Sequence, residues 1–274
     1  ASCAYDASVT ATGDVTDEAD NCGVGEATYS DVVDATDPCS IVITRTWSLV
    51  DDCGNPAADQ VQIITVEDNI APTFTAPADI TIYSDASCTG DASVGNTGDV
   101  TDEADNCGVG NATYSDVVDN SDPCNITITR TWSLVDDAGN PAVDQDQIIT
   151  ILDTISPTAS DPADINVECA ADVPAPDITV VTDEADNCTA APVVAWVSDV
   201  SDLASCPETI TRTYSVTDDC GNSINVEQTI VINDITAPTA VCQDITVQLD
   251  AAGNMSITTS DIDNGSFDNC GAIS

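Results

Sequence analysis

Lysine and histidine are absent from this chain of 274 residues, which contains only three arginines. Without histidine or lysine, neither a Ser-His pair nor a Schiff base can form within the chain, so both kinds of covalent catalysis are excluded. A lysine–asparagine isopeptide cross-link is excluded for the same reason. Because basic residues are so few, we expect no binding to nucleic acid or to anionic lipid.

Long apolar runs are missing as well. No run of apolar residues approaches the roughly 18 that a membrane span requires, so we expect no membrane insertion. No segment places its apolar residues at the 3.6-residue period of a helix.

Acidic residues are abundant instead. The 49 Asp and Glu residues give a formal net charge of −46, yet 42% of the residues are hydrophobic and lie in short runs between turn residues. Acidic disordered tails lack such apolar content, so the composition indicates a folded protein with an acidic surface. Cations are the partners that such a surface attracts.

One segment, Ile43–Asp52 (ITRTWSLVDD), recurs as Ile128–Asp137 and as Ile210–Asp219. Apolar or aromatic residues alternate in it with Thr and Ser, which predicts a strand with one packed and one wetted face. The last two residues of each copy and the three that follow it read Asp-Asp-x-Gly-Asn. This sequence is typical of a turn, because Gly and Asn tolerate positive φ and Asp hydrogen-bonds to its own backbone.

The whole chain is repetitive. Gly13–Gly25 recurs as Gly98–Gly110, and the steps from Cys22 to Cys107 and from Cys107 to Cys188 are 85 and 81 residues. A proline in a short linker marks each boundary. We therefore expect four repeats, of which the first lacks its opening strand and the last is partial, within a longer protein: repeat 1 (1–68), repeat 2 (69–153), repeat 3 (154–234) and repeat 4 (235–274).

Within repeat 2 the pattern predicts strands near Asp79–Ser84, Ala92–Val100, Asn111–Val118, Ile126–Asp136 and Val143–Leu152. Short strands alone, separated by frequent turns, are typical of small two-sheet domains. The predicted fold is all-β, a tandem array of immunoglobulin-like antiparallel β-sandwiches.

Thirteen cysteines, without histidine and without a CxxC motif, favour disulfides over zinc sites and indicate an extracellular protein. Cys39 and Cys53 flank one strand and would lie roughly 40 Å apart, too far for a bond. If neighbouring strands alternate in direction, the cysteines gather at the two ends of each repeat. The predicted pairs are Cys3–Cys39, Cys88–Cys124, Cys169–Cys206, Cys22–Cys53, Cys188–Cys220 and Cys242–Cys270.

Repeat 2 has Ala138 where the partner of Cys107 would stand, so Cys107 is predicted to be a free thiol. The alternative is that Cys107 pairs between molecules.

The same alternation brings two acidic loops beside each linker. Carboxylates so close repel one another unless a cation bridges them, and calcium takes six to eight oxygen ligands in loose geometry, which suits the cluster better than magnesium's octahedron. The alternative is that these residues only form turns and keep the surface soluble. The candidate Ca²⁺ ligands are Asp68, Asn69, Asp102, Glu103, Asp105, Asp136, Asp137, Asp153, Asp183, Glu184, Asp186, Asp218, Asp219, Asp234 and Asp268.

Three short segments carry a family resemblance: Ala76–Thr81 (APADIT), Asp161–Ile165 (DPADI) and Thr217–Asn222 (TDDCGN). With them the chain resembles the hyalin-repeat (HYR) and related immunoglobulin-like tandem repeats of giant secreted surface proteins of Bacteroidota. The resemblance covers the whole chain. It departs from the family at Pro77 and Pro162, where hyalin repeats often have cysteine, so the usual bridge of the family is not expected here.

The resemblance implies an extended extracellular rod in cell adhesion, gliding adhesins or filaments, and each junction is similar to the Asp-Asn-x-x-Pro linkers of cadherins. The acidic residues recur in every repeat, as scaffold residues would, so we expect no enzyme. The expected function is structural: a calcium-stiffened, disulfide-stapled rod or filament segment at the bacterial surface, in contact with neighbouring repeats or copies of itself. The alternative is an adhesin whose repeats bind glycan or protein ligands directly.

Overall fold

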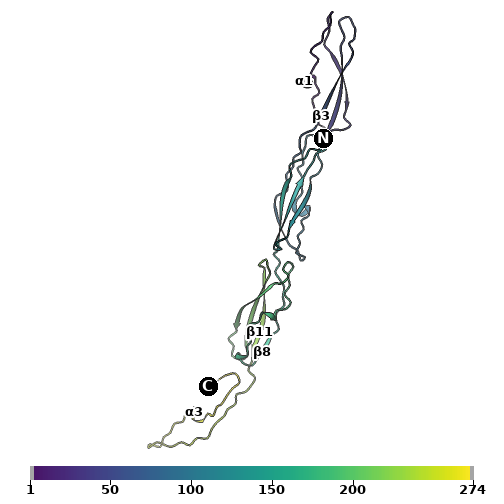
Figure 1. Ribbon diagram of the computed structural model, residues 1–274. Helices are drawn as coiled ribbons and strands as arrows, with labels where there is room; N and C mark the ends of the chain where they lie inside the picture. The colour runs from purple at the N-terminus through teal and green to yellow at the C-terminus, as the bar shows by residue number, and fades with distance from the viewer. Residues whose placement is uncertain (1–2, 272–274) are drawn as a thin grey trace. The chain divides into compact units, whose positions relative to one another are not determined.

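The structure, a computed structural model, describes residues 3–271, and its regular elements are mostly strands (Figure 1). They form three sheets, so the prediction of an all-β chain is confirmed. Repeat 1 has the order β1-β2-β3, with β1 (Thr28–Asp34), β2 (Ser40–Ser48) and β3 (Gln60–Glu67). Repeat 2 has the order β4-β7-β6-β5, with β4 (Ile80–Tyr83), β5 (Thr113–Asp119), β6 (Asn125–Ser133) and β7 (Gln145–Leu152). Repeat 3 has the order β8-β11-β10-β9, with β8 (Ile165–Val167), β9 (Val193–Ser201), β10 (Glu208–Thr217) and β11 (Ser223–Ile232).

The helical elements are single turns: α1 (Val9–Thr12), α2 (Val94–Thr97), η1 (Ala170–Asp172), η2 (Ile178–Val180) and α3 (Thr259–Ile262). Within residues 3–271, no helix has the length and the apolar character that crossing a membrane would require.

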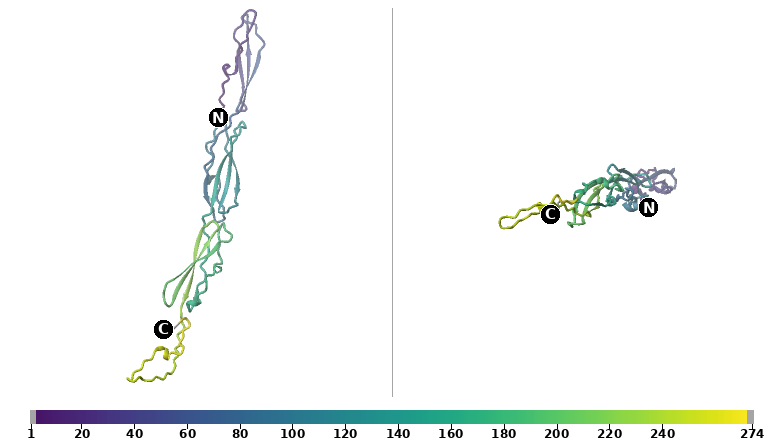
Figure 2. Two further views of the ribbon diagram at one scale, coloured as in Figure 1. Left: turned by 60° about the vertical axis from the view of Figure 1, so that its left-hand side comes forward. Right: turned by 90° about the horizontal axis from the view of Figure 1, so that it is seen from below.

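Strand direction defines two ends in each repeat. In repeat 3, β10 runs antiparallel to both β9 and β11, and β8 runs parallel to β11. We call the end where the preceding linker enters the near end and the opposite one the far end. The start of β10 lies at the far end, beside the last residues of β8 and β11. The sheets of repeats 2 and 3 are seen from two further sides in teal and green in Figure 2.

The central strand of each sheet shows the predicted two-residue period. In β6, Ile128, Arg130 and Trp132 are buried, and the residues between them are only partly buried. The strand ends at Ser133, earlier than predicted, because the turn that follows has its own hydrogen bonds. In that turn Asp136 Oδ1 accepts the backbone N–H of Asn140 at 2.7 Å, and Gly139 adopts φ +93°.

The strand predicted over Ala92–Val100 is wrong, since α2 occupies this range. The buried polar side chains of the neighbouring sheet explain the difference. Arg130 Nη1 donates to Thr97 Oγ1 at 2.9 Å, and Gln147 Nε2 donates to the Thr97 carbonyl at 2.8 Å. One helical turn presents both acceptors toward the sheet, whereas an extended strand alternates its groups between two faces.

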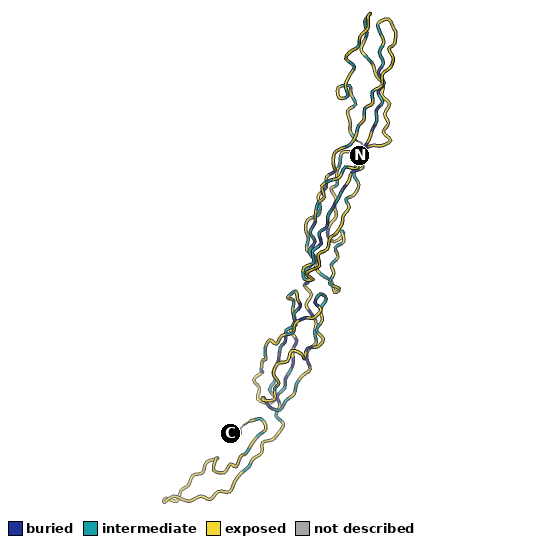
Figure 3. The backbone as a smooth tube through the Cα atoms, in the orientation of Figure 1, coloured by how far each residue is buried: buried dark blue, intermediate teal, exposed yellow. Residues whose placement is uncertain are grey.

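The cores of repeats 2 and 3 lie between the sheet and a second layer of extended segments. In repeat 2, Phe74 and Val100 of that layer pack on Trp132 and Leu134. In repeat 3 the corresponding cluster includes Val181 and Tyr214. Figure 3 shows the buried residues along these sheets and the mostly exposed backbone of residues 235–271, where two isolated bridges and α3 are the regular structure described.

By its internal contacts the chain divides into two compact units. The first consists of Ala1–Ile82 and Gly90–Ile151, and the second of Tyr83–Thr89 and Leu152–Ser274. The division falls inside repeat 2, because the loop after β4, with Ser84 and Cys88, is bonded to residues of repeat 3.

Candidate functional site

Carboxylates from three separate loops meet where repeat 2 adjoins repeat 1. Asp68 comes from the linker, Asp105 from the loop before Cys107, and Asp136 from the turn after β6. Each offers an oxygen that lies within 4.8 Å of the other two. Asp136 is buried, and the other two are half-buried. The loops therefore concentrate negative charge in a partly desolvated place.

Asparagine amides and backbone N–H groups fix these three side chains. Asn106 Nδ2 donates to Asp68 Oδ1 at 3.0 Å, and Asn140 Nδ2 donates to Asp136 Oδ2 at 2.8 Å. Asp105 Oδ2 accepts the backbone N–H of Cys107 at 2.7 Å. One oxygen of each carboxylate is thus held in place by the protein.

The second compact unit contains the same arrangement at the start of repeat 3. Asp153, Asp186 and Asp218 again offer oxygens within 4.8 Å of one another. Ser84 Oγ donates to Asp153 Oδ1 at 2.8 Å, and Asn187 Nδ2 donates to the same oxygen at 3.1 Å. Ser84 was not among the predicted ligands, because nothing in its local sequence sets it apart from other residues that follow a strand.

Several oxygens at these two clusters are buried and accept no hydrogen bond. They are Asp68 Oδ2 and Asp105 Oδ1 at the first cluster, and Asp153 Oδ2, Asp186 Oδ1, Glu184 Oε2 and Asn187 Oδ1 at or beside the second. A buried polar atom without a partner is costly, and these atoms are hard oxygen donors of the kind that calcium binds. The donor set therefore fits a Ca²⁺ ion.

The buried carboxylates are also held in their charged form. Burial raises the pKa of Asp136, but hydrogen bonds from Asn140 and from the backbone of Ala138 and Gly139 together lower it by more, so the net pKa lies below the ordinary value. Burial likewise raises the pKa of Asp153, and hydrogen bonds from Ser84, Asn187 and the backbone of the following residues together more than offset it. Only a cation would neutralise such groups at neutral pH.

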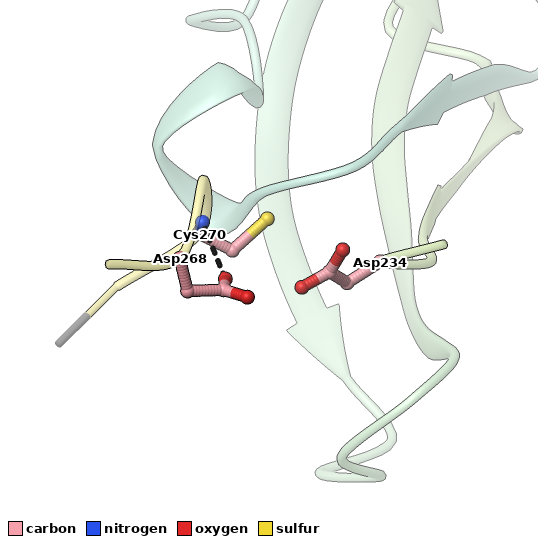
Figure 4. A group of neighbouring side chains, drawn as sticks. All are labelled: Asp234, Asp268 and Cys270. Atoms are coloured by element: carbon pink, nitrogen blue, oxygen red, sulfur yellow. Dashed lines mark hydrogen bonds between the residues drawn. The ribbon is translucent and has the colours of Figure 1, made fainter. Parts of the chain in front are cut away.

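A third, smaller group lies at the start of repeat 4. Asp234, Asp268 and Cys270 have ligand atoms within 4.8 Å of one another, and Figure 4 shows the two carboxylates facing each other. Asp268 Oδ1 accepts the backbone N–H of Cys270 at 2.9 Å. The sulfur of Cys270 is in a disulfide, so this group supplies two carboxylates only.

The remaining candidate ligands lie outside these groups. Asp102 and Asp183 accept backbone N–H groups from the segment after the linker, Thr75 at 2.9 Å and Ser160 at 3.0 Å. The Glu103 side chain accepts the N–H of Ala112. The N–H of Asp137 donates to Gly108, and the N–H of Asp219 donates to Thr189. Asn69 lines a cavity of about 190 Å³ beside Asp68. These side chains position the loops around the clusters.

The disulfides cross from one repeat to the next. Cys3 bonds to Cys107, Cys88 to Cys188 and Cys169 to Cys270, with Cα–Cα distances of 4.5, 4.9 and 4.8 Å. Cys124 and Cys220 are disulfide-bonded as well. The predicted pairs are therefore wrong: Cys3–Cys39, Cys88–Cys124, Cys169–Cys206, Cys188–Cys220 and Cys242–Cys270 conflict with the observed bonds, and Cys22 and Cys53 are both free.

The error has a physical cause. Alternating strand direction does place Cys88 at the far end of repeat 2 and Cys188 at the near end of repeat 3. The far end of one repeat adjoins the near end of the next, and the sulfur that comes within reach belongs to the neighbour rather than to the same repeat.

Cys107 is bonded, so its assignment as the free thiol is wrong, and the unpaired cysteine at this junction is Cys39. Cys39 is buried close to Asp137, and burial followed by the charges of Asp37 and Asp137 raises the pKa of its thiol. The next residue in that turn is Ala138, which has no sulfur to offer. Within residues 3–271 the other free cysteines are Cys22, Cys53, Cys206 and Cys242, all exposed.

The three arginines are buried and serve the fold. Arg130 pairs with Asp116 of the neighbouring strand at 2.8 Å, donates to the Ala92 carbonyl at 2.7 Å and lies 4.1 Å from the centre of the Tyr114 ring. Arg45 and Arg212 pair in the same way, with Asp31 and Asp199 at 2.8 Å. The aromatic ring closest to Arg130 belongs to the neighbouring strand, since Trp132 on its own strand lies 6.0 Å away.

Comparisons with known proteins place part of this chain. No curated protein sequence matches it. Among solved structures, extracellular cadherin domains 3–6 of protocadherin gamma B2 share 12% identity with a TM-score of 0.27 over 73% of this chain and 61% of that one. The human desmocollin-1 ectodomain shares 11% with a TM-score of 0.24, over 74% and 50%. This chain thus spans less than two thirds of either structure, and we draw no functional conclusion from similarities this low.

The family comparison is more specific. Four cysteines lie within residues 157–232, namely Cys169, Cys188, Cys206 and Cys220, and the bonds of Cys169 and Cys188 leave that range, to Cys270 and Cys88. Residues 157–232 match the family model of the HYR-like domain with 4 cysteines.

Proposed function

We propose that this chain is a load-bearing segment of an extracellular, non-enzymatic repeat array, a rod or filament at a bacterial surface. The observation that carries the proposal is the overlap of the three disulfide-closed loops. They span residues 3–107, 88–188 and 169–270, so each loop begins before the previous one has ended.

The overlap creates a short covalent route through the chain. From Cys3 the route crosses to Cys107, runs back to Cys88, crosses to Cys188, runs back to Cys169 and crosses to Cys270. Each backward stretch has 19 residues (107 − 88 and 188 − 169). All other residues between Cys3 and Cys270 lie off the route and would bear no tension after unfolding.

The route limits extension. At about 3.5 Å per extended residue, the two stretches and three bridges allow at most about 150 Å between Cys3 and Cys270. The reduced chain would allow about 900 Å over the same 267 residues (270 − 3). An array built this way keeps its length under a pulling force even if the sheets of its repeats unfold.

Single-molecule force spectroscopy on the full chain, pulled from both ends, tests the proposal. We expect the oxidised chain to reach a contour length of about 150 Å and the reduced chain about 900 Å. Cys188→Ser should raise the oxidised value to about 230 Å, because the direct stretch from Cys107 to Cys169 joins the route.

The matched control is Cys242→Ser, which removes an exposed free thiol off the route and should leave the contour length unchanged. An oxidised chain that extends to several hundred ångströms would contradict the proposal.

We propose further that Ca²⁺ occupies the two three-carboxylate clusters and stiffens the joints between repeats. The support is the set of buried oxygens without hydrogen bonds at Asp68 and Asp105, and at Asp153 and Asp186. When bound, the ion would supply positive charge to three converging loops and tie the linker to the repeat that follows. Each cluster would thus oppose bending at the same place where the disulfides oppose separation.

Calorimetric titration of the oxidised chain with CaCl₂, after treatment with chelator, tests this second point. We expect two sites, one of which is weakened about tenfold or more by Asp136→Asn and the other by Asp218→Asn. Asp146→Asn, at an exposed carboxylate that accepts only from Thr131, is the control and should change neither. Binding that persists in the double variant would show that calcium lies elsewhere.

A further inference from the structure

We infer that the near end of repeat 1 is a docking face for the far end of another repeat of this type, which it binds through two disulfides at Cys22 and Cys53. The inference rests on the proposed function, since it extends the same kind of joint beyond the three repeats that form sheets. Its test examines different cysteines, so the inference and the proposed function can fail independently.

The positions of the two thiols carry the inference. Cys22 stands in repeat 1 where Cys107 and Cys188 stand in repeats 2 and 3, each preceded by the same acidic segment, TDEADN. Both of those cysteines bond to the far end of another repeat, at Cys3 and Cys88. Cys53 stands where Cys220 stands in repeat 3, and Cys220 is disulfide-bonded too.

The loops that present Cys22 and Cys53 already have the geometry of a formed joint. Asp20 Oδ2 accepts the N–H of Cys22 at 2.9 Å, as Asp105 and Asp186 do from Cys107 and Cys188 at 2.7 and 2.8 Å. Both thiols are exposed in repeat 1, whereas Cys107 is buried. The face is therefore pre-formed.

The turn that carries Cys53 repeats the same geometry. Asp51 Oδ1 accepts the N–H of Asn55 at 2.7 Å, the distance found between Asp136 and Asn140. Asp20 and Asp51 are the counterparts of Asp105 and Asp136, so an aspartate from a partner linker would complete a third three-carboxylate cluster.

The chemistry of the partner follows from the two formed joints. It is a repeat whose far end offers one cysteine after its opening strand, as Cys88 does to Cys188, and a second cysteine for Cys53. The far-end cysteines Cys3, Cys88 and Cys169 of this chain already have partners. In each new bond two thiols lose two protons and two electrons, which pass to the disulfide of a thiol–disulfide oxidoreductase in the oxidising compartment.

A disulfide map of the native protein, isolated without reductant from the cells that make it, tests the inference. Free thiols are alkylated first, and the protein is then digested with pepsin at acid pH to prevent exchange and read by mass spectrometry. We expect Cys22 and Cys53 to escape alkylation and to be linked to two different peptides from the far end of a like repeat. A denaturing gel without reductant shows whether that repeat belongs to the same polypeptide or to a second one.

Two other cysteines serve as internal controls for the map, one bonded and one free. Cys107 should be linked to Cys3, and Cys39 should be alkylated only after unfolding, since it is buried and unpaired. Alkylated Cys22 and Cys53, a bond between the two, or a small thiol on either would overturn the inference. Loss of the Cys3–Cys107 peptide would instead contradict the proposed function.

Discussion

Cys88 and Cys188 are 100 residues apart in the sequence and form a disulfide with their Cα atoms 4.9 Å apart. The bond joins the loop after the opening strand β4 of repeat 2 to the acidic loop of repeat 3, one residue from Asn187, whose amide donates to Asp153 at 3.1 Å. Sulfur and carboxylate chemistry therefore act on one joint, and the predictions below separate their contributions.

The Cys88–Cys188 bond should stabilise the fold appreciably. In the chain-entropy account a loop of about 100 residues contributes about 4 to 5 kcal/mol, so we expect Cys188→Ser to lower the free energy of unfolding of its part of the chain by about 3 to 5 kcal/mol. Denaturant titration of the oxidised protein measures the change. Cys242→Ser, at an exposed free thiol, should fall within about 0.5 kcal/mol of the parent protein. Equal stability of both variants would count against the assigned bond.

Ala138→Cys should create a disulfide with Cys39. Cys39 is buried near Asp137 and lacks a partner only because residue 138 has no sulfur. We expect the number of thiols titrated after denaturation to fall by one, and stability to rise by about 2 to 4 kcal/mol. Val143→Cys, at a site 84% exposed, should instead add one titratable thiol. A gain of one thiol in the Ala138→Cys variant would refute the proximity of Cys39 to this turn.

Arg130→Met should destabilise repeat 2 by about 2 to 4 kcal/mol, because it leaves Asp116, Thr97 Oγ1 and the Ala92 carbonyl without their donor. Thermal unfolding followed by circular dichroism gives the change. Arg130→Lys should recover only part of the loss, since an ammonium group cannot form the bidentate pair with Asp116. Full recovery by lysine would show that charge alone matters at this site.

Asp202 should make stability depend on pH in the acid range. Its carboxylate accepts the backbone N–H groups of Ala204 and Thr209, each at 3.0 Å, and these bonds hold its pKa below the ordinary value. A folded pKa below the unfolded value of about 3.9 adds stability above that pH, and this stability is lost as the pH falls through the folded pKa. Asp202→Ala should therefore lower the melting temperature by about 2 °C at pH 7 and by progressively less below about pH 4.

The exposed Asp144 provides the control for that experiment. Asp144→Ala should show the same melting temperature as the parent protein at pH 7 and below about pH 4. A difference for Asp202→Ala that stays constant down to pH 2 would mean that the carboxylate charge plays no part.

Much of the architecture followed from local sequence. The alternation in Ile128–Asp137 predicted a half-buried strand, because a two-residue period puts successive side chains on opposite faces whatever surrounds them. The Asp-Asp-x-Gly-Asn turn was equally local, since Asp136 and Asn140 bond to each other. Strand reversal also placed the linker, Asp105 and Asp136 at one end, which is why these three candidate ligands are found together.

The choice of disulfide partner was decided by tertiary structure. Cys88 lies at the far end of repeat 2 together with Cys124, and the sequence alone offered the intrarepeat bond as the simpler solution. The same end also adjoins Cys188 of the next repeat, and two sulfurs bond only if packing brings their Cα atoms within about 7 Å. The strand period and the turn residues predict at which end of a repeat a cysteine lies. Which second cysteine it bonds to depends on how one repeat packs on the next. The α2 turn at Val94–Thr97 has the same origin, since the buried Arg130 and Gln147 of another strand set its shape.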